Sequence, residues 1–211
     1  MRVFHFRDAE FGLKSIKERR LKVARILELN DPFEFLGANL KDREFRRAMN
    51  NIKEKLSETK GLLCFSKTWN NPVLWSHYAD HHRGVCLEFE IPEKNLSKVD
   101  YVEERIQYSG DIDTSLMRRF LTTKFEHWSY EQEYRAFIGL DLESAEDGLY
   151  FMDFDDNLVL KSVIIGHSSL VTRLDVSTAL GSIKGEVETF KARAAFTRFE
   201  VIRNENENRW T

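Results

Sequence analysis

The segment Tyr130–Arg135, with the sequence YEQEYR, holds the side chains best suited to chemistry. Glu131 and Glu133 lie two residues apart at the entrance to a predicted strand, Tyr134–Leu140, so they point to the same face if the strand extends back over them. Two carboxylates on one face repel each other, and at least one of them needs a compensating cation or acquires a raised pKa. Such a pair of carboxylates is costly in a buried core and useful in a cleft. The alternative is two solvated glutamates with Arg135 as a surface partner.

Two further segments hold polar residues that packing does not require. His5 and Arg7 flank Phe6 on a predicted first strand, so both point away from the face that Phe6 occupies. If this is an edge strand, both are simply exposed. Ser66 and Thr68 follow a predicted buried strand and place two hydroxyl groups at its end.

The run from Trp75 to Gly84 is dense in side chains that stack and hydrogen-bond, Trp75 and Tyr78 among them. His77 and His81 are four residues apart on a predicted helix, a spacing that metal sites use. The residues between them do not include the glutamate of the zinc-protease pattern. We therefore predict no metal site.

The segment Asn30–Glu34 contains an Asp-Pro step, which disfavours helix at Asp31 and predicts a turn. We expect Asp31 or Asn30 to bond nearby backbone amides. We also expect Phe33 to be buried as an anchor.

Composition limits the class of protein. With 211 residues, 42% of them hydrophobic, the chain can bury a core, and we predict one domain over residues 1–203 with a frayed polar tail, residues 204–211. The formal net charge of −3 does not suggest nucleic-acid binding by bulk charge. Cys64 and Cys86 lie among apolar residues and indicate a reducing compartment. Neither a signal peptide nor a membrane-spanning stretch is predicted, so we expect a cytoplasmic protein with no membrane partner.

The secondary-structure elements that must position the candidate site residues follow no regular alternation of strands and helices. Helices are predicted mainly in the first two thirds and strands mainly in the last third, and no glycine-rich phosphate loop is present. The predicted class is α+β, with mixed or antiparallel sheets. Two expected helices have N-caps at Asp8 and Asp113, and three more span 42–60, 71–82 and 168–180. Gly61 directly follows the helix over 42–60, at the position where glycine commonly ends a helix in a left-handed conformation. The expected strands span 3–6, 62–65, 85–89, 99–102, 134–140, 149–154, 158–165 and 187–202, with one more from Lys22.

Four segments together resemble a widespread bacterial family of uncharacterised domains. The similarity runs from His5 to about Gly166 and names a relative without naming a reaction. The segments are Leu29–Glu34 (LNDPFE), Trp75–Ala79 (WSHYA), Gly84–Phe89 (GVCLEF) and Trp128–Arg135 (WSYEQEYR).

A more distant resemblance does suggest a reaction. A first strand with His5, a middle strand that ends in Ser66-Lys67-Thr68 and a late strand introduced by Glu131-Gln132-Glu133 resemble the plan of ADP-ribosyltransferases. This resemblance implies a split-sheet core that binds NAD without a glycine-rich loop. This middle motif departs from the usual Ser-Thr-Ser pattern, because Lys67 lies at its centre.

The resemblance also implies roles for the site residues. Glu133 would stabilise the cation that forms when the ribose–nicotinamide bond breaks, and Glu131 would accept the proton of the acceptor. The predicted NAD contacts are His5 at the adenosine ribose, Arg7 or Arg135 at the pyrophosphate, Ser66 and Thr68 of the middle motif, and Trp75 or Tyr78 at the nicotinamide.

The sequence thus favours an NAD-dependent ADP-ribosyltransferase-like enzyme, a bacterial defence or toxin effector whose acceptor is a protein or a nucleic acid. One alternative is a metal-dependent nuclease with Asp31, Glu34, Glu131 and Glu133 as ligands of Mg²⁺. Another is a non-catalytic domain that binds nucleotide or nucleic acid.

Overall fold

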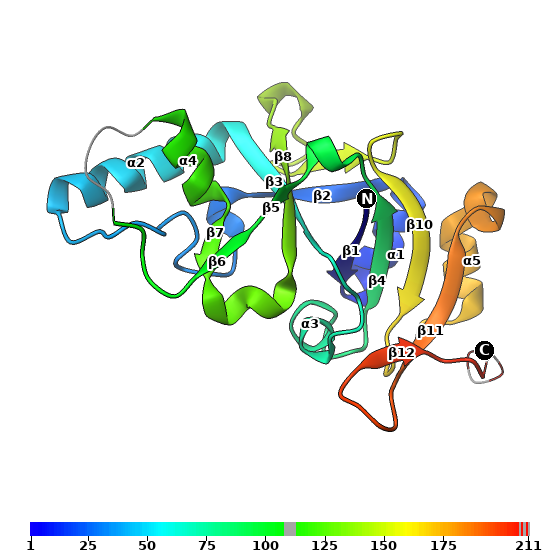
Figure 1. The fold of residues 1–211 in the computed structure, drawn as a ribbon. Helices are drawn as coiled ribbons and strands as arrows, with labels where there is room; N and C mark the ends of the chain where they lie inside the picture. Colours follow the sequence, from blue (N-terminus) through cyan, green and yellow to red (C-terminus); the bar gives the residue numbers. More distant parts are fainter. Residues whose placement is uncertain (108–112, 207, 209, 211) are drawn as a thin grey trace. The chain divides into compact units, whose positions relative to one another are not determined.

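The structure, a computed structural model, describes residues 1–107, 113–206, 208 and 210. Helices and strands are mixed along the chain (Figure 1). The chain divides into two compact units. Neither unit is one continuous stretch. Unit 1 consists of Met1–Leu21, Phe65–Asn95 and Met152–Thr211, and unit 2 of Lys22–Cys64 and Leu96–Phe151.

The strands of unit 1 form a mixed sheet. Its central strand, β4 (Val85–Glu90), is antiparallel to both of its neighbours, β1 (Arg2–Arg7) and β10 (Val159–Ile165). Strand β11 (Glu188–Ala194) runs parallel to β10 and pairs in antiparallel fashion with β12 (Val201–Arg203). On the other side, β1 pairs with the last residue of β3 (Lys60–Ser66), where Phe4 lies opposite Ser66.

Three α-helices belong to unit 1: α1 (Ala9–Glu18), α3 (Pro72–Tyr78) and α5 (Arg173–Leu180). The Asp8 carboxylate caps α1 by accepting a hydrogen bond from the Phe11 amide, as predicted. Helix α3 is shorter than predicted, because Asp80, His81 and His82 all have positive φ angles. The prediction that His77 and His81 share a helix face was therefore wrong.

Unit 2 contains a second set of paired strands. Strand β2 (Arg20–Arg25), most of which lies in this unit, is antiparallel to β3, and β8 (Glu133–Gly139) pairs with both β3 and β5 (Ser97–Lys98). Strands β6 (Asp100–Val102) and β7 (Thr123–Phe125) form a separate parallel pair. One further strand, β9 (Tyr150–Asp153), begins at the end of this unit.

Two capped α-helices pack in unit 2. Asp113 caps α4 (Thr114–Leu121), as the sequence predicts, and Asp42 caps α2 (Arg43–Thr59). Buried Met49 and Phe120 meet in one core cluster with Ala38 and Ile106. The chain also forms short 3₁₀ helices: η1 (Ile26–Glu28), η2 (Glu93–Asn95), η3 (Glu126–Glu131), η4 (Leu142–Ser144) and η5 (Gly181–Gly185).

Three expectations about the elements need correction. Gly61 does not end α2 in a left-handed conformation; it lies in β3, where a side chain would meet Val23 and the Ala24 carbonyl. Strands are spread over the chain and not concentrated in its last third. The tail is not frayed at Trp210, which is buried, donates from Nε1 to the Val171 carbonyl at 2.9 Å and lies under the Arg173 guanidinium.

No helix in the described residues is long and apolar enough to cross a membrane.

Candidate functional site

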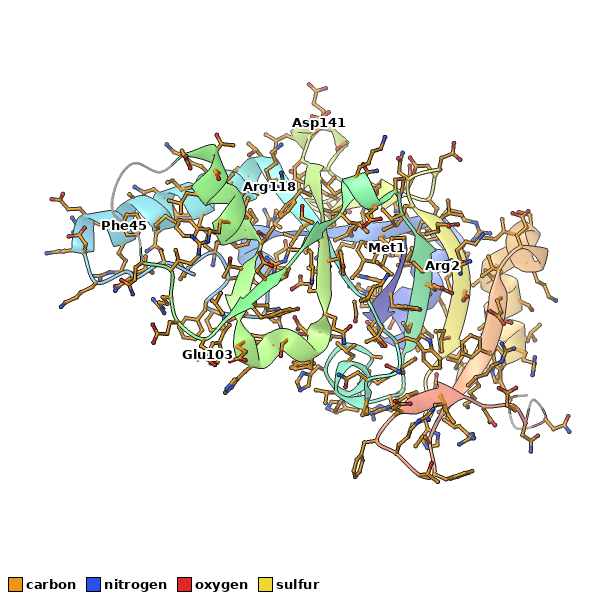
Figure 2. All side chains as sticks on the ribbon, viewed as in Figure 1. Met1, Arg2, Phe45, Glu103, Arg118 and Asp141 are labelled. Carbon is orange, nitrogen blue, oxygen red and sulfur yellow. The ribbon has the colours of Figure 1, made fainter. Side chains whose placement is uncertain are left out.

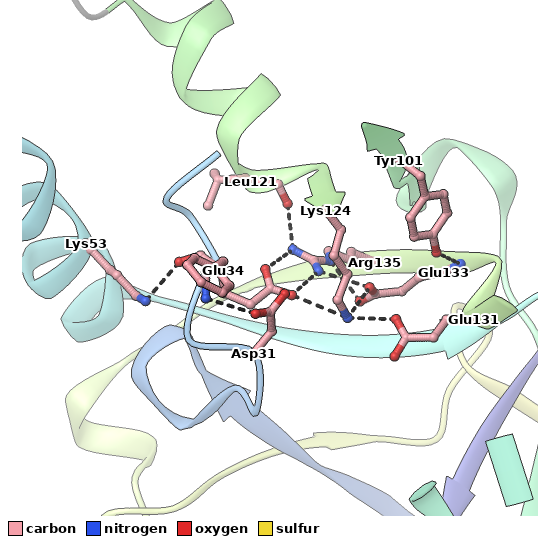
Figure 3. Close-up of polar contacts among 10 residues, drawn as sticks. Asp31, Glu34, Lys53, Tyr101, Leu121, Lys124, Glu131, Glu133 and Arg135 are labelled. Carbon is pink, nitrogen blue, oxygen red and sulfur yellow. Dashed lines mark hydrogen bonds and ion pairs between the residues drawn. The ribbon is translucent and has the colours of Figure 1, made fainter. Parts of the chain in front are cut away.

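Five buried charged side chains of unit 2 meet in one network (Figure 3). We call them the acidic cluster, since three are carboxylates and two are cations. All five have less than a tenth of their surface exposed. The members are Glu34, Lys124, Glu131, Glu133 and Arg135.

Arg135 lies at the centre of the cluster and is completely buried. Its guanidinium holds Glu133 through Nε at 2.8 Å and Nη2 at 3.0 Å, and Glu34 through Nη2 at 2.7 Å and Nη1 at 3.0 Å. Nη1 also donates to the Leu121 carbonyl at 2.9 Å. These contacts engage all five N–H donors of the side chain. Arg135 therefore has no donor left for a pyrophosphate, and its predicted role as an NAD contact was wrong.

Lys124 supplies the second positive charge. Its Nζ lies 2.7 Å from Glu131, 3.4 Å from Glu133 and 3.5 Å from Glu34. The ammonium also lies 4.7 Å from the centre of the Trp128 ring, within the range of a cation–π contact. This one side chain thus contacts every carboxylate of the cluster.

The backbone brings the two glutamates to the same cation. Glu131 is the last residue of η3 and Glu133 the first of β8, and Gln132 between them has a left-handed conformation with φ of 46°. The Glu133 amide donates to the Tyr101 hydroxyl at 2.8 Å. The predicted compensating cations are thus present, but the glutamates converge through a turn and not through regular strand alternation.

Glu34 reaches the cluster from the predicted turn. Asp31 accepts a hydrogen bond from the Phe33 amide at 2.9 Å, which confirms the predicted Asx-turn. Phe33, however, is 55% exposed, and Phe35 is the buried aromatic residue of this segment. Lys53 donates to the Glu34 carbonyl at 2.9 Å and closes the turn against α2.

The charges of the cluster shift the pKa values of Glu133, Lys124 and the Cys64 thiol. Burial alone would raise the pKa of Glu133, but the positive charges of Arg135 and Lys124, together with the hydrogen bonds from Arg135, outweigh burial and lower it. Burial opposes the charged form of Lys124, yet the three carboxylates raise its pKa above the usual value. Loss of water and the charge of Glu133 raise the pKa of the Cys64 thiol well above its usual range. Glu133 is therefore ionised and Cys64 protonated at neutral pH.

A pocket of about 340 Å³ lies in unit 2 beside the cluster. Lys124 belongs to both, and the exposed rings of Phe33 and Phe125 line the pocket. Arg105 lies over the Phe33 ring at 5.2 Å, and Glu103 projects from the loop after β6 (Figure 2). The remaining lining residues are Leu36, Gly37, Val102, Glu104 and Thr123. The pocket is thus mainly apolar, with charges of both signs.

Several predicted NAD contacts belong to unit 1. The His5 ring lies 5.7 Å from Phe65, at the end of β3, and Ser66 accepts a hydrogen bond from the Thr68 amide at 3.2 Å. Tyr78 is half-buried at the end of α3 and contacts His77 edge-on.

The two remaining predicted contacts of unit 1 have ring partners. The Arg7 guanidinium lies over the Phe11 ring at 5.6 Å. Trp75 is completely buried, meets Phe6 edge-on at 5.2 Å and donates to the Trp69 carbonyl at 2.6 Å. The alternative in which Trp75 stacks on nicotinamide was therefore wrong, since this indole is a core residue.

The sequence did not identify Lys124 or Tyr101 as site residues, and it assigned Glu34 only to the metal alternative. Lys124 follows two threonines in a segment without a recognised motif. Glu34 lies 101 residues before Arg135, so no local spacing connects them. A useful signal was available in the unbalanced Glu131–Glu133 pair, which requires a buried cation from elsewhere in the chain.

The described residues contain no group of three or more His, Cys, Asp and Glu side chains that could hold a metal ion. Where the carboxylates of the acidic cluster converge, the Lys124 ammonium occupies the space between them. No observation in this structure thus favours the nuclease alternative.

Comparisons with family models, with curated proteins and with solved structures gave no match for this chain. The two resemblances described from the sequence stay predictions.

Proposed function

We propose that the protein is an NAD-dependent ADP-ribosyltransferase-like enzyme in which the acidic cluster stabilises positive charge. The observation that carries this proposal is the charge balance of the cluster. Its two cations face three carboxylates, which leaves a formal charge of −1 in a buried environment. Including Asp31 and Lys53 leaves the balance unchanged. A buried charge acts strongly on its surroundings because water does not screen it.

Cleavage of NAD creates positive charge at the ribose. The bond between ribose C1′ and the nicotinamide nitrogen breaks, its electron pair leaves with neutral nicotinamide, and the ribose becomes an oxocarbenium-like cation. An oxygen or nitrogen atom of the acceptor then bonds to C1′, and its proton passes to Glu131 and on to solvent. Glu133, kept ionised by its lowered pKa, stabilises the cation. Such fixed charges contribute about 3–4 kcal/mol per group.

Five residues of unit 1 stay predicted contacts of NAD: His5, Arg7, Ser66, Thr68 and Tyr78. His5→Ala is expected to raise KM for NAD and to change kcat little, because His5 is assigned to the adenosine end of the molecule.

The test is nicotinamide release from NAD, measured by chromatography with the wild-type protein and Glu133→Gln. The glutamine keeps the shape of the side chain but removes its charge, so we expect release to fall about a hundredfold or more. Glu126→Gln is the matched control, since Glu126 is exposed on η3 close to the cluster. Circular dichroism and thermal unfolding establish that each variant is folded. Undetectable release from the wild type, or equal release from a folded Glu133→Gln, would exclude this chemistry.

Glu131→Gln separates the two carboxylates. It is expected to spare slow hydrolysis of NAD, since water still attacks C1′, and to suppress transfer to an acceptor. Equal losses of hydrolysis and transfer would merge the two roles.

A further inference from the structure

Figure 1 shows the loop between β11 and β12, which belongs to unit 1. Two exposed phenylalanines lie on this loop. Phe196 is 89% exposed and Phe199 is 99% exposed. Single exposed apolar residues are common, but two rings within four residues on one loop form a local aromatic surface. Their exposure is unfavourable in water. We call residues 195–200 the aromatic loop.

The loop is held in a defined conformation. The Ala195 amide donates to the Glu200 carbonyl at 2.9 Å and closes the loop, and the Glu200 amide donates to the Arg198 carbonyl at 3.0 Å. At its base, the Val201 amide donates to the Asn70 carbonyl at 2.8 Å. A ligand of the loop therefore meets rings whose backbone is already ordered, which lowers the entropy cost of binding.

Basic residues accompany the rings. Residues 188–203 contain four Arg or Lys residues and two Glu residues, an excess of +2 in a chain whose formal charge is −3. The Arg193 guanidinium lies 4.5 Å from the centre of the Phe196 ring, and no ion pair among the described residues involves it. Arg198 pairs with Glu200 at 2.5 Å, beside Phe199. The loop and the adjoining end of β11 thus combine flat aromatic surface with the positive charge of Arg193.

We propose that the aromatic loop binds single-stranded nucleic acid, with unstacked bases on Phe196 and Phe199 and phosphates beside Arg193. Bases stack on aromatic side chains regardless of sequence, and phosphates require positive charge nearby. Both requirements are met by the loop together with Arg193, near the end of β11. This binding is separate from the proposed cleavage of NAD.

Other partners fit the loop less well. Insertion of Phe196 into a lipid bilayer would carry the Arg193 guanidinium and the Arg198–Glu200 pair toward the hydrocarbon, at a high cost. Two phenylalanine rings also offer much less than the roughly 800 Å² per partner of a stable protein interface.

The base of the aromatic loop contacts the segment that follows β3 in unit 1. Asn70, which accepts the hydrogen bond from Val201, also bonds with the Thr68 side chain. Trp69 meets Phe190 of β11 at 5.5 Å. The base of the hairpin therefore packs against the segment that carries the predicted Ser66 and Thr68 contacts.

The test is fluorescence anisotropy with a fluorescein-labelled twenty-nucleotide oligo(dT), measured without NAD at 50 mM and 200 mM salt. We expect the wild type to bind, with lower affinity at high salt. Phe196→Ala/Phe199→Ala is expected to weaken binding at least tenfold, because stacking is lost. Arg193→Ala should weaken binding and reduce the salt dependence. Leu170→Ala is the matched control, since Leu170 is an equally exposed apolar residue of unit 1.

The side chains of Leu170, Phe196 and Phe199 are exposed and that of Arg193 is half-buried, so the variants are expected to fold, and thermal unfolding checks this. Absence of oligonucleotide binding, or equal binding by the double phenylalanine variant, would overturn the proposal. A second arm measures cosedimentation with vesicles of 70% phosphatidylcholine and 30% phosphatidylserine. Vesicle binding that depends on the two rings, without oligonucleotide binding, would assign the loop to a lipid surface. Because NAD is absent, a failed NAD assay leaves this result unaffected.

Discussion

At the scale of single residues, Arg135 determines whether the acidic cluster is tolerated in the fold. It engages Glu34 and Glu133 with paired hydrogen bonds and is fully buried, so its removal would leave two buried carboxylates with Lys124 as their remaining partner in the cluster. Buried charges that lose a partner are strongly destabilising.

We predict that Arg135→Met lowers the free energy of unfolding by about 3–5 kcal/mol. Urea unfolding followed by circular dichroism measures this loss. Arg25→Met is the control, because Arg25 forms an exposed ion pair with Glu28 whose loss should cost under about 1 kcal/mol. Similar losses in the two variants would contradict the assignment of a structural role to Arg135.

The lowered pKa of Glu133 predicts a pH dependence of stability. A carboxyl group with a lower pKa in the folded state stabilises the fold above its unfolded pKa, near 4.5, and this contribution is lost as the pH falls through the folded value. Urea midpoints between pH 7 and pH 3 should therefore fall less steeply below pH 5 in Glu133→Gln than in the wild type. Parallel curves for the two proteins would contradict the lowered pKa.

The sequence predicted that the acidic cluster needs a cation, but it did not identify which residues supply one. The two glutamates indicated that a cation was needed, and the structure supplies Lys124 and Arg135. The burial of Arg135 and the participation of Glu34 depend on contacts across 101 residues, which no local pattern records. Trp75 was wrongly assigned to the nicotinamide for a similar reason. An indole in a polar segment can face either a ligand or the core, and the local pattern does not distinguish the two.

At the scale of elements, Gly84 allows β4 to begin close to β1. A Cβ atom at this position would lie 2.1 Å from the Arg7 carbonyl oxygen and 3.0 Å from the Ala79 backbone, and backbone atoms cannot move aside easily. We predict that Gly84→Ala destabilises the protein by about 1–3 kcal/mol, measured as a lower Tm. Gly185→Ala is the control, because nothing lies within 4 Å of its added carbon. An unchanged Tm for Gly84→Ala would show that the two strands separate readily.

Local sequence patterns correctly predicted features that depend on contacts between residues close together in the sequence. Asp8 and Asp113 cap the helices that they were predicted to cap, because the bond from the side chain to the backbone spans only three residues. Gly61 was assigned to the end of α2 on the same kind of rule. Its actual requirement is space against Val23 and Ala24 of a neighbouring strand, which the local sequence does not show.

At the scale of the whole molecule, the chain passes repeatedly between its two units. The passages at Leu21–Lys22, Cys64–Phe65 and Phe151–Met152 fall inside β2, β3 and β9. Domain boundaries are recognised in a sequence by polar or proline-rich linkers, and strand interiors have no such composition. The division into units therefore had no signal in the sequence, although the α+β mixture did.

Because segments of the two units alternate along the chain, the units are completed at different times during synthesis. The last residue of unit 2 is Phe151, whereas unit 1 needs strands from the end of the chain. Strand β4 is complete at Glu90, but its partner β10 begins only at Val159. At a synthesis rate of roughly 5–20 residues per second, the nascent β4 waits several seconds with one edge unpaired. Open strand edges invite pairing with other chains, so this interval on the ribosome is when the protein is most exposed to aggregation.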